Sequence, residues 1–208
     1  MNAQRARSIV ASPRAGGVWG LVFVFLLFAS AAMASLPTSA NSADAIVAFY
    51  RHHASLVILQ QIIGVLAIVP LVAFGLALGG SRWARLALLL LVVIELVTNL
   101  VPLLIVAAPE SGGTLTSVED GADSALFIAV ALFLIAATRD DPPWVRVAAY
   151  VVAAACVGRA FASPLGIDSL DQVAPLAFVA MIVLLSVRRL VRQPDQKGLD
   201  SGPNYRGS

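Results

Sequence analysis

The sequence has little charge and almost no cysteine. Of its 208 residues, 12% are charged and 59% are hydrophobic, and the charged share is about half that of an ordinary soluble domain. The single cysteine, Cys156, excludes an internal disulfide and a Cys-x-x-Cys redox pair, so we interpret it as a small packing residue. The basic residues form no stripe of the kind that binds nucleic acid, and no nucleic-acid partner is expected.

Motifs of catalysis and of cofactor binding are missing as well. The sequence contains no HExxH, no G-x-S-x-G, no P-loop and no dinucleotide fingerprint. His52 and His53 are adjacent and point about 100° apart on a helix, so they are interpreted as solvated interfacial histidines, with pH sensing as the alternative. The acidic stretch ESGGTLTSVEDGAD lacks the ligand spacing of an EF-hand and is expected to form a solvated outer loop, with weak cation attraction as the alternative. No metal and no cofactor are therefore expected.

Long apolar runs dominate the rest of the chain. Crossing a hydrocarbon core of about 30 Å takes about 20 mostly apolar residues in a helix. Six runs approach this length, so we expect an all-α, polytopic transmembrane bundle of six spans within residues 17–190. The spans are predicted near 17–36, 54–78, 83–108, 122–138, 144–161 and 173–187. Residues 1–16 are expected to form a cytoplasmic tail, and the polar residues 191–208 a disordered cytoplasmic tail.

The placement of the basic residues predicts that both termini are cytoplasmic. With that orientation, twelve of the fourteen Arg and Lys residues lie on the inner side, whereas the outer loops keep Arg51 among acidic residues. Those acidic residues are Asp44, Glu110, Glu119, Asp120, Asp123, Asp168 and Asp171. Trp19, Trp83 and Trp144 fall at the inner ends of spans, where an interfacial indole is favoured. We expect a multi-pass protein of the plasma membrane, and the Arg-, Ala-, Gly- and Pro-rich composition, with GC-rich codons, indicates a bacterial one.

The first apolar run has a second interpretation. A basic segment with three arginines precedes it, and Ala32-Met33-Ala34 has the form of an A-x-A cleavage site. Cleavage as a secretory signal would leave five spans in the same orientation. We expect the first span to be retained, because the apolar run through Leu36 is long enough to cross the membrane.

A glutamate lies in the middle of the third apolar run. In LLLLVVIELVTNLVPLLIV, Glu95 is the only charged side chain, and a charge near a bilayer centre costs about 2.5 to 3.5 kcal/mol. Glu95, Thr98, Asn99 and Pro102 share one helix face, which is expected to point into the bundle, and Pro102 is expected to kink the helix. These residue types are typical of ion and proton pathways. The alternative is that Glu95 is neutral or ion-paired and only holds the bundle together.

Arg159, near the outer end of the fifth run, is the expected partner of Glu95. At 1.5 Å per residue, Glu95 lies about 18 Å from Trp83 and Arg159 about 22 Å from Trp144, a difference that an arginine side chain spans. Two alternatives remain open. Arg159 either extends outward to lipid headgroups or pairs with an outer acid such as Asp123.

Other intramembrane residues suggest how the helices meet. Gln60 and Gln61 on the second span are interpreted as interhelical hydrogen-bonding residues, with the lining of a polar cavity as the alternative. Small residues that permit close helix contact recur on two spans, namely Gly64 and Gly75 on the second and Ala154, Gly158 and Ala162 on the fifth. We expect these faces to pack against other helices, a protein partner or a second copy of the chain.

The outer segment ANSADAIVAFYRHHASLVILQQ resembles the segment before the second span in a family of small polytopic membrane proteins common in actinobacteria. They share an Asp-x-x-x-x-Phe-Tyr pattern, here Asp44, Phe49 and Tyr50. The resemblance implies several spans and no particular activity. Independently, Ser42 as N-cap and Asp44 in the first turn predict an interfacial helix that runs into the second span.

These observations favour a non-enzymatic integral membrane protein, an accessory or sensing subunit surrounded by the lipid bilayer. The alternative is a small proton- or ion-coupled transporter with Glu95 as the carrier. A membrane-embedded enzyme is the third interpretation, because such enzymes escape the common motifs.

Overall fold

The computed structural model describes residues 13–78 and 81–191, and regular structure in this part of the chain is helical. The long helices are α2 (Pro13–Ala31), α3 (Ala43–Ala77), α4 (Arg82–Ala107), α5 (Gly112–Ala137), α6 (Pro143–Ala162) and α7 (Val173–Val191). Three short 3-10 helices, η1 (Pro109–Ser111), η2 (Ser163–Leu165) and η3 (Asp168–Leu170), lie in connections. The predicted all-α class is confirmed. Most of both predicted tails, residues 1–12 and 192–208, lies outside the described residues.

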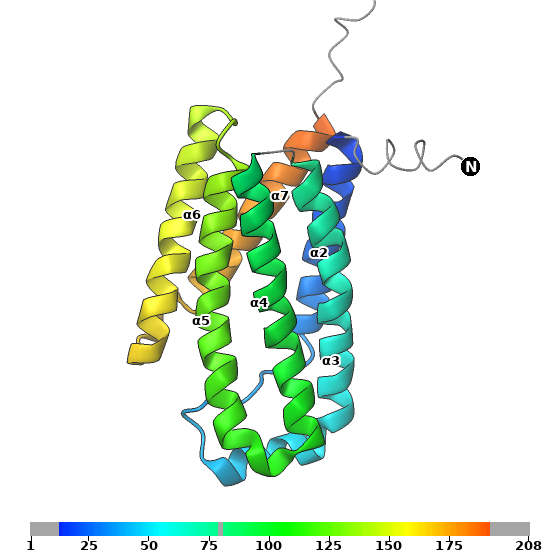
Figure 1. Cartoon of the computed structure of the whole chain (residues 1–208), viewed down its shortest axis with the longest axis vertical. Coiled ribbons are helices and arrows are strands. Elements are labelled where there is room, and N and C mark those ends of the chain that lie inside the picture. Colours follow the sequence, from blue (N-terminus) through cyan, green and yellow to red (C-terminus); the bar gives the residue numbers. More distant parts are fainter. Residues whose placement is uncertain (1–12, 79–80, 192–208) are drawn as a thin grey trace, which may run out of the picture.

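The six long helices form a closed ring (Figure 1). Each helix packs against the next along the chain, and α7 returns to pack against α2. We call the end that holds the start of α3 and the 3-10 helix η1 the η1 end. The opposite end, which holds the α5–α6 connection and the end of α7, is the Arg188 end. The order of the helices around the ring decides which residues at the same level along the bundle axis can be in contact.

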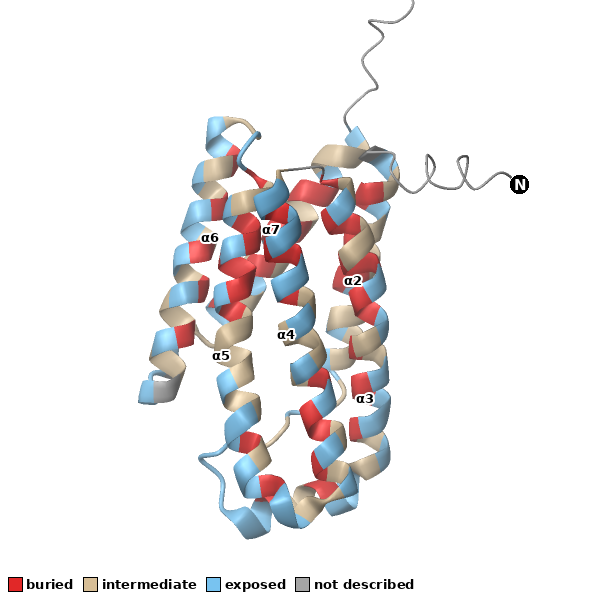
Figure 2. Ribbon diagram, viewed as in Figure 1, coloured by how far each residue is buried: buried red, intermediate tan, exposed pale blue. Residues whose placement is uncertain are grey.

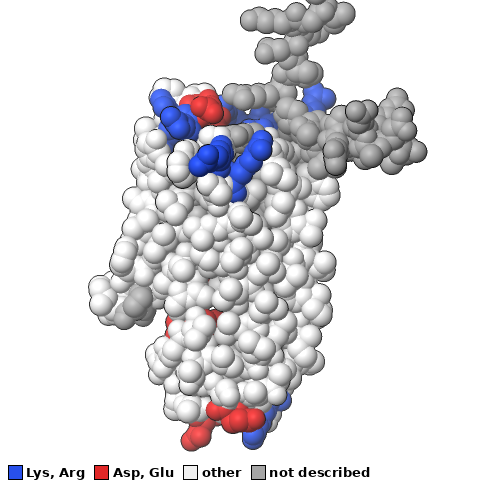
Figure 3. Space-filling view, in the orientation of Figure 1, with Lys and Arg blue, Asp and Glu red and all other residues white. Residues whose placement is uncertain are grey.

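All six long helices are long and apolar enough to cross a membrane. Large apolar side chains are exposed along their outward faces, including Leu66, Val69, Leu104 and Val151. Figure 3 shows that charged side chains gather at the two ends, with a broad and almost uncharged belt between them. A belt of this kind suits a hydrocarbon environment, because exposed apolar surface is costly in water.

Two apolar clusters fill the inside of the ring. The larger lies toward the Arg188 end and includes Phe74, Phe133 and Ile182, all at most 1% exposed. The smaller joins the start of α3 to the end of α4, where Tyr50 and Ile105 are fully buried. Figure 2 shows the buried residues concentrated on the inward faces of the helices.

The predicted helix that runs into the second span is confirmed as the first part of α3. The Ser42 side chain accepts a hydrogen bond from the Ala45 amide, and Asp44 lies in the first turn, where the helix dipole favours an acid. The helix then bends at His53, whose torsion angles are φ −113° and ψ 17°. Pro102, where a kink was expected, lies inside α4, which continues to Ala107. The non-helical torsion angles that the structure records within a helix are those of His53 in α3.

The sequence interpretation of the acidic stretch was wrong. Helix α5 begins at Gly112, whereas the span was predicted to begin near residue 122, so the supposed outer loop forms the first turns of a helix. Hydropathy marks only the part of a helix that suits lipid, and α5 extends beyond that part. The first helix also ends earlier than predicted, at Ala31, ahead of the Leu36-Pro37 pair that disfavours helix.

Small residues set the closest helix contacts, although not all those predicted. Gly64 and Gly75 on α3 both face α4, where an added Cβ would collide with Asn99 or Leu88. In the row Ala154, Gly158 and Ala162, Ala154 is exposed, and an added Cβ at Gly158 would lie 3.0 Å from Leu170 Cδ1 of η3, not against another long helix. Helix α6 instead turns inward a second row of small residues, Ala149, Ala153, Cys156 and Ala160.

Candidate functional site

Glu95 lies in the middle of α4 and is partly buried. Its carboxyl oxygen Oε1 accepts a hydrogen bond of 3.3 Å from Asn99 Nδ2, which also donates to the Glu95 carbonyl at 2.7 Å. The Thr98 hydroxyl donates to the same carbonyl at 2.9 Å. Asn99 and Pro102 are buried, as expected for an inward face. Within the described residues, no ion pair involves Glu95.

Helix α3 supports this face through a glycine. A Cβ built on Gly64 would lie 1.9 Å from Asn99 Oδ1 and 2.9 Å from Asn99 Cγ, so the amide rests directly on the α3 backbone. Asn99 is only 5% exposed. The contact orients the amide so that its nitrogen meets Glu95, and a larger residue at position 64 would displace it.

The expected ion pair between Glu95 and Arg159 is wrong. Arg159 Nη1 donates to Asp123 Oδ2 at 2.7 Å, and Arg159 Nε lies 3.2 Å from Asp171 Oδ1, in contact without a well-aligned hydrogen bond. The guanidinium also lies over the Phe127 ring, 3.9 Å from its centroid. Pairing with Asp123 was one of the alternatives that the sequence left open.

Ring order explains the error. Glu95 and Arg159 were matched by depth alone, and the helix starts at Arg82 and Pro143 support that match. However, α5 packs between α4 and α6, and it brings Asp123 to the same region. Asp123 belonged to the stretch interpreted as a loop, so its place on a helix facing Arg159 was not predicted.

Gln60 forms only part of the interhelical bonding predicted for it, because its side chain contacts the connection after α2 and its backbone carbonyl contacts α2 itself. Its Nε2 donates to the Ala34 carbonyl at 3.2 Å, and its own carbonyl accepts from Ser30 Oγ at 3.1 Å, which ties α3 to the end of α2. The side-chain oxygen of Gln60 is buried without a hydrogen-bond partner. Gln61 is 5% exposed. Lining of a polar cavity by these two residues remains a prediction.

The η1 end holds polar contacts that the sequence did not reveal. The buried Tyr50 hydroxyl donates to Glu119 Oε2 at 3.4 Å, and the Ser39 amide donates to Asp120 Oδ2 at 2.9 Å. These bonds join the α2–α3 connection and the start of α3 to α5. The Asp-x-x-x-x-Phe-Tyr pattern identified Tyr50 as notable, but it gave no indication of an acidic partner 69 positions away.

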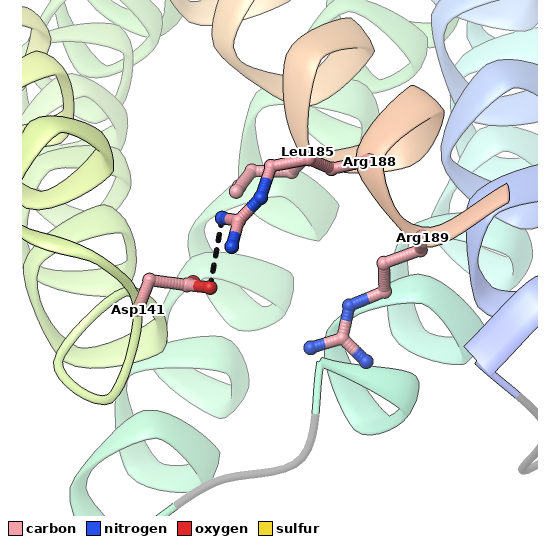
Figure 4. Close-up of a pocket in the computed structure, with 4 residues that line it drawn as sticks. All are labelled: Asp141, Leu185, Arg188 and Arg189. Atoms are coloured by element: carbon pink, nitrogen blue, oxygen red, sulfur yellow. Dashed lines mark hydrogen bonds and ion pairs between the residues drawn. The ribbon is translucent and has the colours of Figure 1, made fainter. Parts of the chain in front are cut away.

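At the Arg188 end, two arginines of α7 tie three helices together (Figure 4). Arg188 Nη1 donates to Asp141 Oδ1 at 2.9 Å, and its guanidinium lies 5.4 Å from the Trp144 ring centroid. Arg189 donates to the carbonyls of Ala77 and Leu78, which are acceptors at the end of α3. With Leu185, these side chains line a small recess. Arg188 and Arg189, which contribute to the prediction of topology, therefore also hold the ends of neighbouring helices together.

Metal binding finds no support in the described residues. They include no group of three or more His, Cys, Asp or Glu residues that could hold a metal ion. His52 and His53 are exposed, and their Nδ1 atoms donate to the carbonyls of Ala48 and Phe49 on their own helix. The two side chains are exposed as expected, and their position at a membrane interface stays a prediction.

Comparisons with known proteins add no functional constraint. No protein-family model matches the chain, and neither the curated proteins nor the solved structures include a significant match. The resemblance of the Asp44, Phe49 and Tyr50 segment to actinobacterial membrane proteins therefore stays a prediction.

Proposed function

We propose that the chain is a multi-pass protein of a bacterial plasma membrane, with the Arg188 end in the cytoplasm. The six apolar helices support the first part. Basic residues concentrate at the Arg188 end, which supports the orientation by the positive-inside rule. The exposed Trp83 and Trp144 near the starts of α4 and α6 suit the headgroup region of that side.

Within that membrane we propose that the protein is a small proton- or ion-coupled transporter in which Glu95 binds and releases the proton. One observation carries this proposal: the cation expected to pair with Glu95, Arg159, is held by two aspartates, while Glu95 is bonded to an amide. A carboxyl at this depth without a cation is costly as a charge and is best explained by a functional role. An accessory or sensing subunit is the competing interpretation, and it loses its main support with the Glu95–Arg159 pair.

Proton flux in proteoliposomes tests the proposal. With a pH gradient and valinomycin to balance charge, the wild-type protein should acidify the vesicle interior, and Glu95→Gln should abolish this flux because the amide cannot carry a proton. Glu110→Gln is the matched control, since Glu110 is an exposed acid at the η1 end with 73% of its side chain accessible. Circular dichroism should show that all three proteins are folded.

An infrared titration separates the two candidate functions. A Glu95 carboxyl band that appears and disappears reversibly with pH, and that is absent in Glu95→Gln, should accompany flux in a transporter. A titrating band without flux would favour a sensing subunit instead. A Glu95 carboxyl band that does not change over the whole pH range in which the protein stays folded would rule out proton binding by Glu95, both in a transporter and in a sensing subunit.

A further inference from the structure

Asp123 lies at the same level of the bundle as Glu95, on the neighbouring helix. The two residues belong to a hairpin in which α4 and α5 are joined by η1. At 1.5 Å per residue, Glu95 lies about 18 Å before the end of α4 at Ala107, and Asp123 about 17 Å after the start of α5 at Gly112. The two helices pack against each other, so Glu95 and Asp123 lie at the same level on adjacent helices.

Asp123 is the more exposed member of its ion pair with Arg159. Its side chain is 40% exposed, whereas the side chain of its partner Arg159 is 13% exposed. One turn closer to the η1 end, the same helix carries Glu119 and Asp120, and both are partly exposed. Figure 3 shows acidic atoms reaching the surface within the otherwise uncharged belt, apart from the acidic group at the η1 end. Along α5, Glu119, Asp120 and Asp123 follow one another from the η1 end toward the level of Glu95.

The other elements packed around Glu95 offer no competing group. Between Ala54 and Ala77, helix α3 contains no charged residue, and it presents Gly64 to the neighbour of Glu95. On its own helix the contact of the carboxyl is the Asn99 amide. Arg159 is engaged by Asp123 and Asp171. Asp123 is thus the titratable group placed to exchange a proton with Glu95.

We propose that Asp123 is the relay through which Glu95 exchanges its proton with the aqueous phase at the η1 end, and that Arg159 is the positioning residue of this relay. The inference rests on the proposed function of Glu95. Hydronium in that phase gives a proton to the Asp123 carboxylate, and the proton then passes to the Glu95 carboxylate. Asp123 returns to its charged form as Glu95 becomes neutral, and the reverse sequence releases the proton.

Arg159 gives the relay its geometry. The 2.7 Å bond fixes one oxygen of Asp123 and leaves the other, Oδ1, without a bond to Arg159. Asp171 holds the guanidinium from the other side, so Arg159 keeps its place while Asp123 is briefly neutral.

Time-resolved infrared spectroscopy after a pH jump tests the relay in reconstituted full-length protein. Asp123→Asn should slow the appearance of the protonated Glu95 band at least about a hundredfold, the low end of effects for positioned acid–base groups. Asp123→Glu restores a carboxyl and should recover most of the rate. Asp140→Asn, at an exposed site in the α5–α6 connection, should leave the rate unchanged. Arg159→Lys should shift the pH dependence of the rate while Glu95 still titrates.

The outcomes distinguish this inference from the proposed function. If the Glu95 band does not titrate in the wild-type protein, the proposed function fails. If it titrates and Asp123→Asn leaves the rate unchanged, the relay is wrong while a proton-binding Glu95 stands. Should Asp123→Asn fail to fold, a one-sided pH jump on oriented wild-type vesicles decides. Glu95 should respond to the solution at the η1 end, and a response confined to the Arg188 end would overturn the relay.

Discussion

Arg159→Ala should lower the free energy of unfolding by about 2 to 4 kcal/mol, because it leaves Asp123 and Asp171 without the cation between them. Breaking a fully buried pair costs about 3 to 5 kcal/mol, and the partial exposure of both acids reduces this cost. The contact with the Phe127 ring is lost as well. Reversible unfolding in mixed micelles, followed by circular dichroism, measures the difference.

Arg51→Ala is the matched control for this loss. Arg51 also pairs with an acid, Glu110, but at 3.8 Å and with side chains that are 64% and 73% exposed. An exposed pair of this kind contributes at most about 1 kcal/mol. Equal losses for the two variants would mean that the position of Arg159 between two acids adds nothing to stability.

A double-mutant cycle identifies the partner of Arg159. Asp123→Asn and Arg159→Ala should show a clear coupling energy, because each removes the same contact. Glu95→Gln and Arg159→Ala should be closer to additive, since α5 lies between their helices. The reverse ranking would restore the ion pair that the sequence suggested.

The fold was predictable because its main determinant is local. A run of about 20 apolar residues must form its hydrogen bonds within a helix if it is to lie in lipid, so composition alone located six helices. Ser42 and Asp44 marked a helix start for the same local reason. The start of α5 was missed because its first turns are polar, and their helical state depends on contacts such as the bond from Ser39 to Asp120.

Only part of the candidate site was predictable. The contacts within one helix could be predicted, and the contacts between helices could not. Glu95, Thr98 and Asn99 are neighbours on one helix, so spacing alone placed them together, and their hydrogen bonds confirm it. The partner of Arg159 depends on which helix lies beside α6, and depth along a span carries no such information. The contact of Asn99 with Gly64 is likewise tertiary. The sequence feature that could have predicted this contact is the pairing of a polar residue on one span with a glycine on the next.

Gly64→Ala should destabilise the protein by about 1 to 3 kcal/mol, although alanine is the better helix former by about 1 kcal/mol. The new Cβ would lie 1.9 Å from Asn99 Oδ1 and 2.9 Å from Asn99 Cγ, so the side chain must move. Asn99 has little room to do so, because it is 5% exposed and its nitrogen is bonded to Glu95 twice. Unfolding in mixed micelles measures the cost.

Gly121→Ala separates this collision from helix propensity. Gly121 is also inside a helix, but an added Cβ there would meet nothing within 4 Å, so the change should stabilise α5 or leave it unaffected. Asn99→Ala provides the second control, because it removes the atoms that the new methyl group strikes. The loss from Gly64→Ala should therefore be smaller in the Asn99→Ala background, and an undiminished loss would place its origin elsewhere.

The same substitution links packing to the site. If Gly64 orients the Asn99 amide toward Glu95, then Gly64→Ala should shift the infrared band of the Glu95 carboxyl, since it disturbs the 3.3 Å hydrogen bond to Oε1. Gly75→Ala offers a comparison on the same helix, because its added Cβ would strike Leu88 and not a polar group. That variant should lose stability and leave the Glu95 band in place. Identical band positions for Gly64→Ala and the wild-type protein would mean that the Asn99 amide does not tune Glu95, whatever the cost in stability.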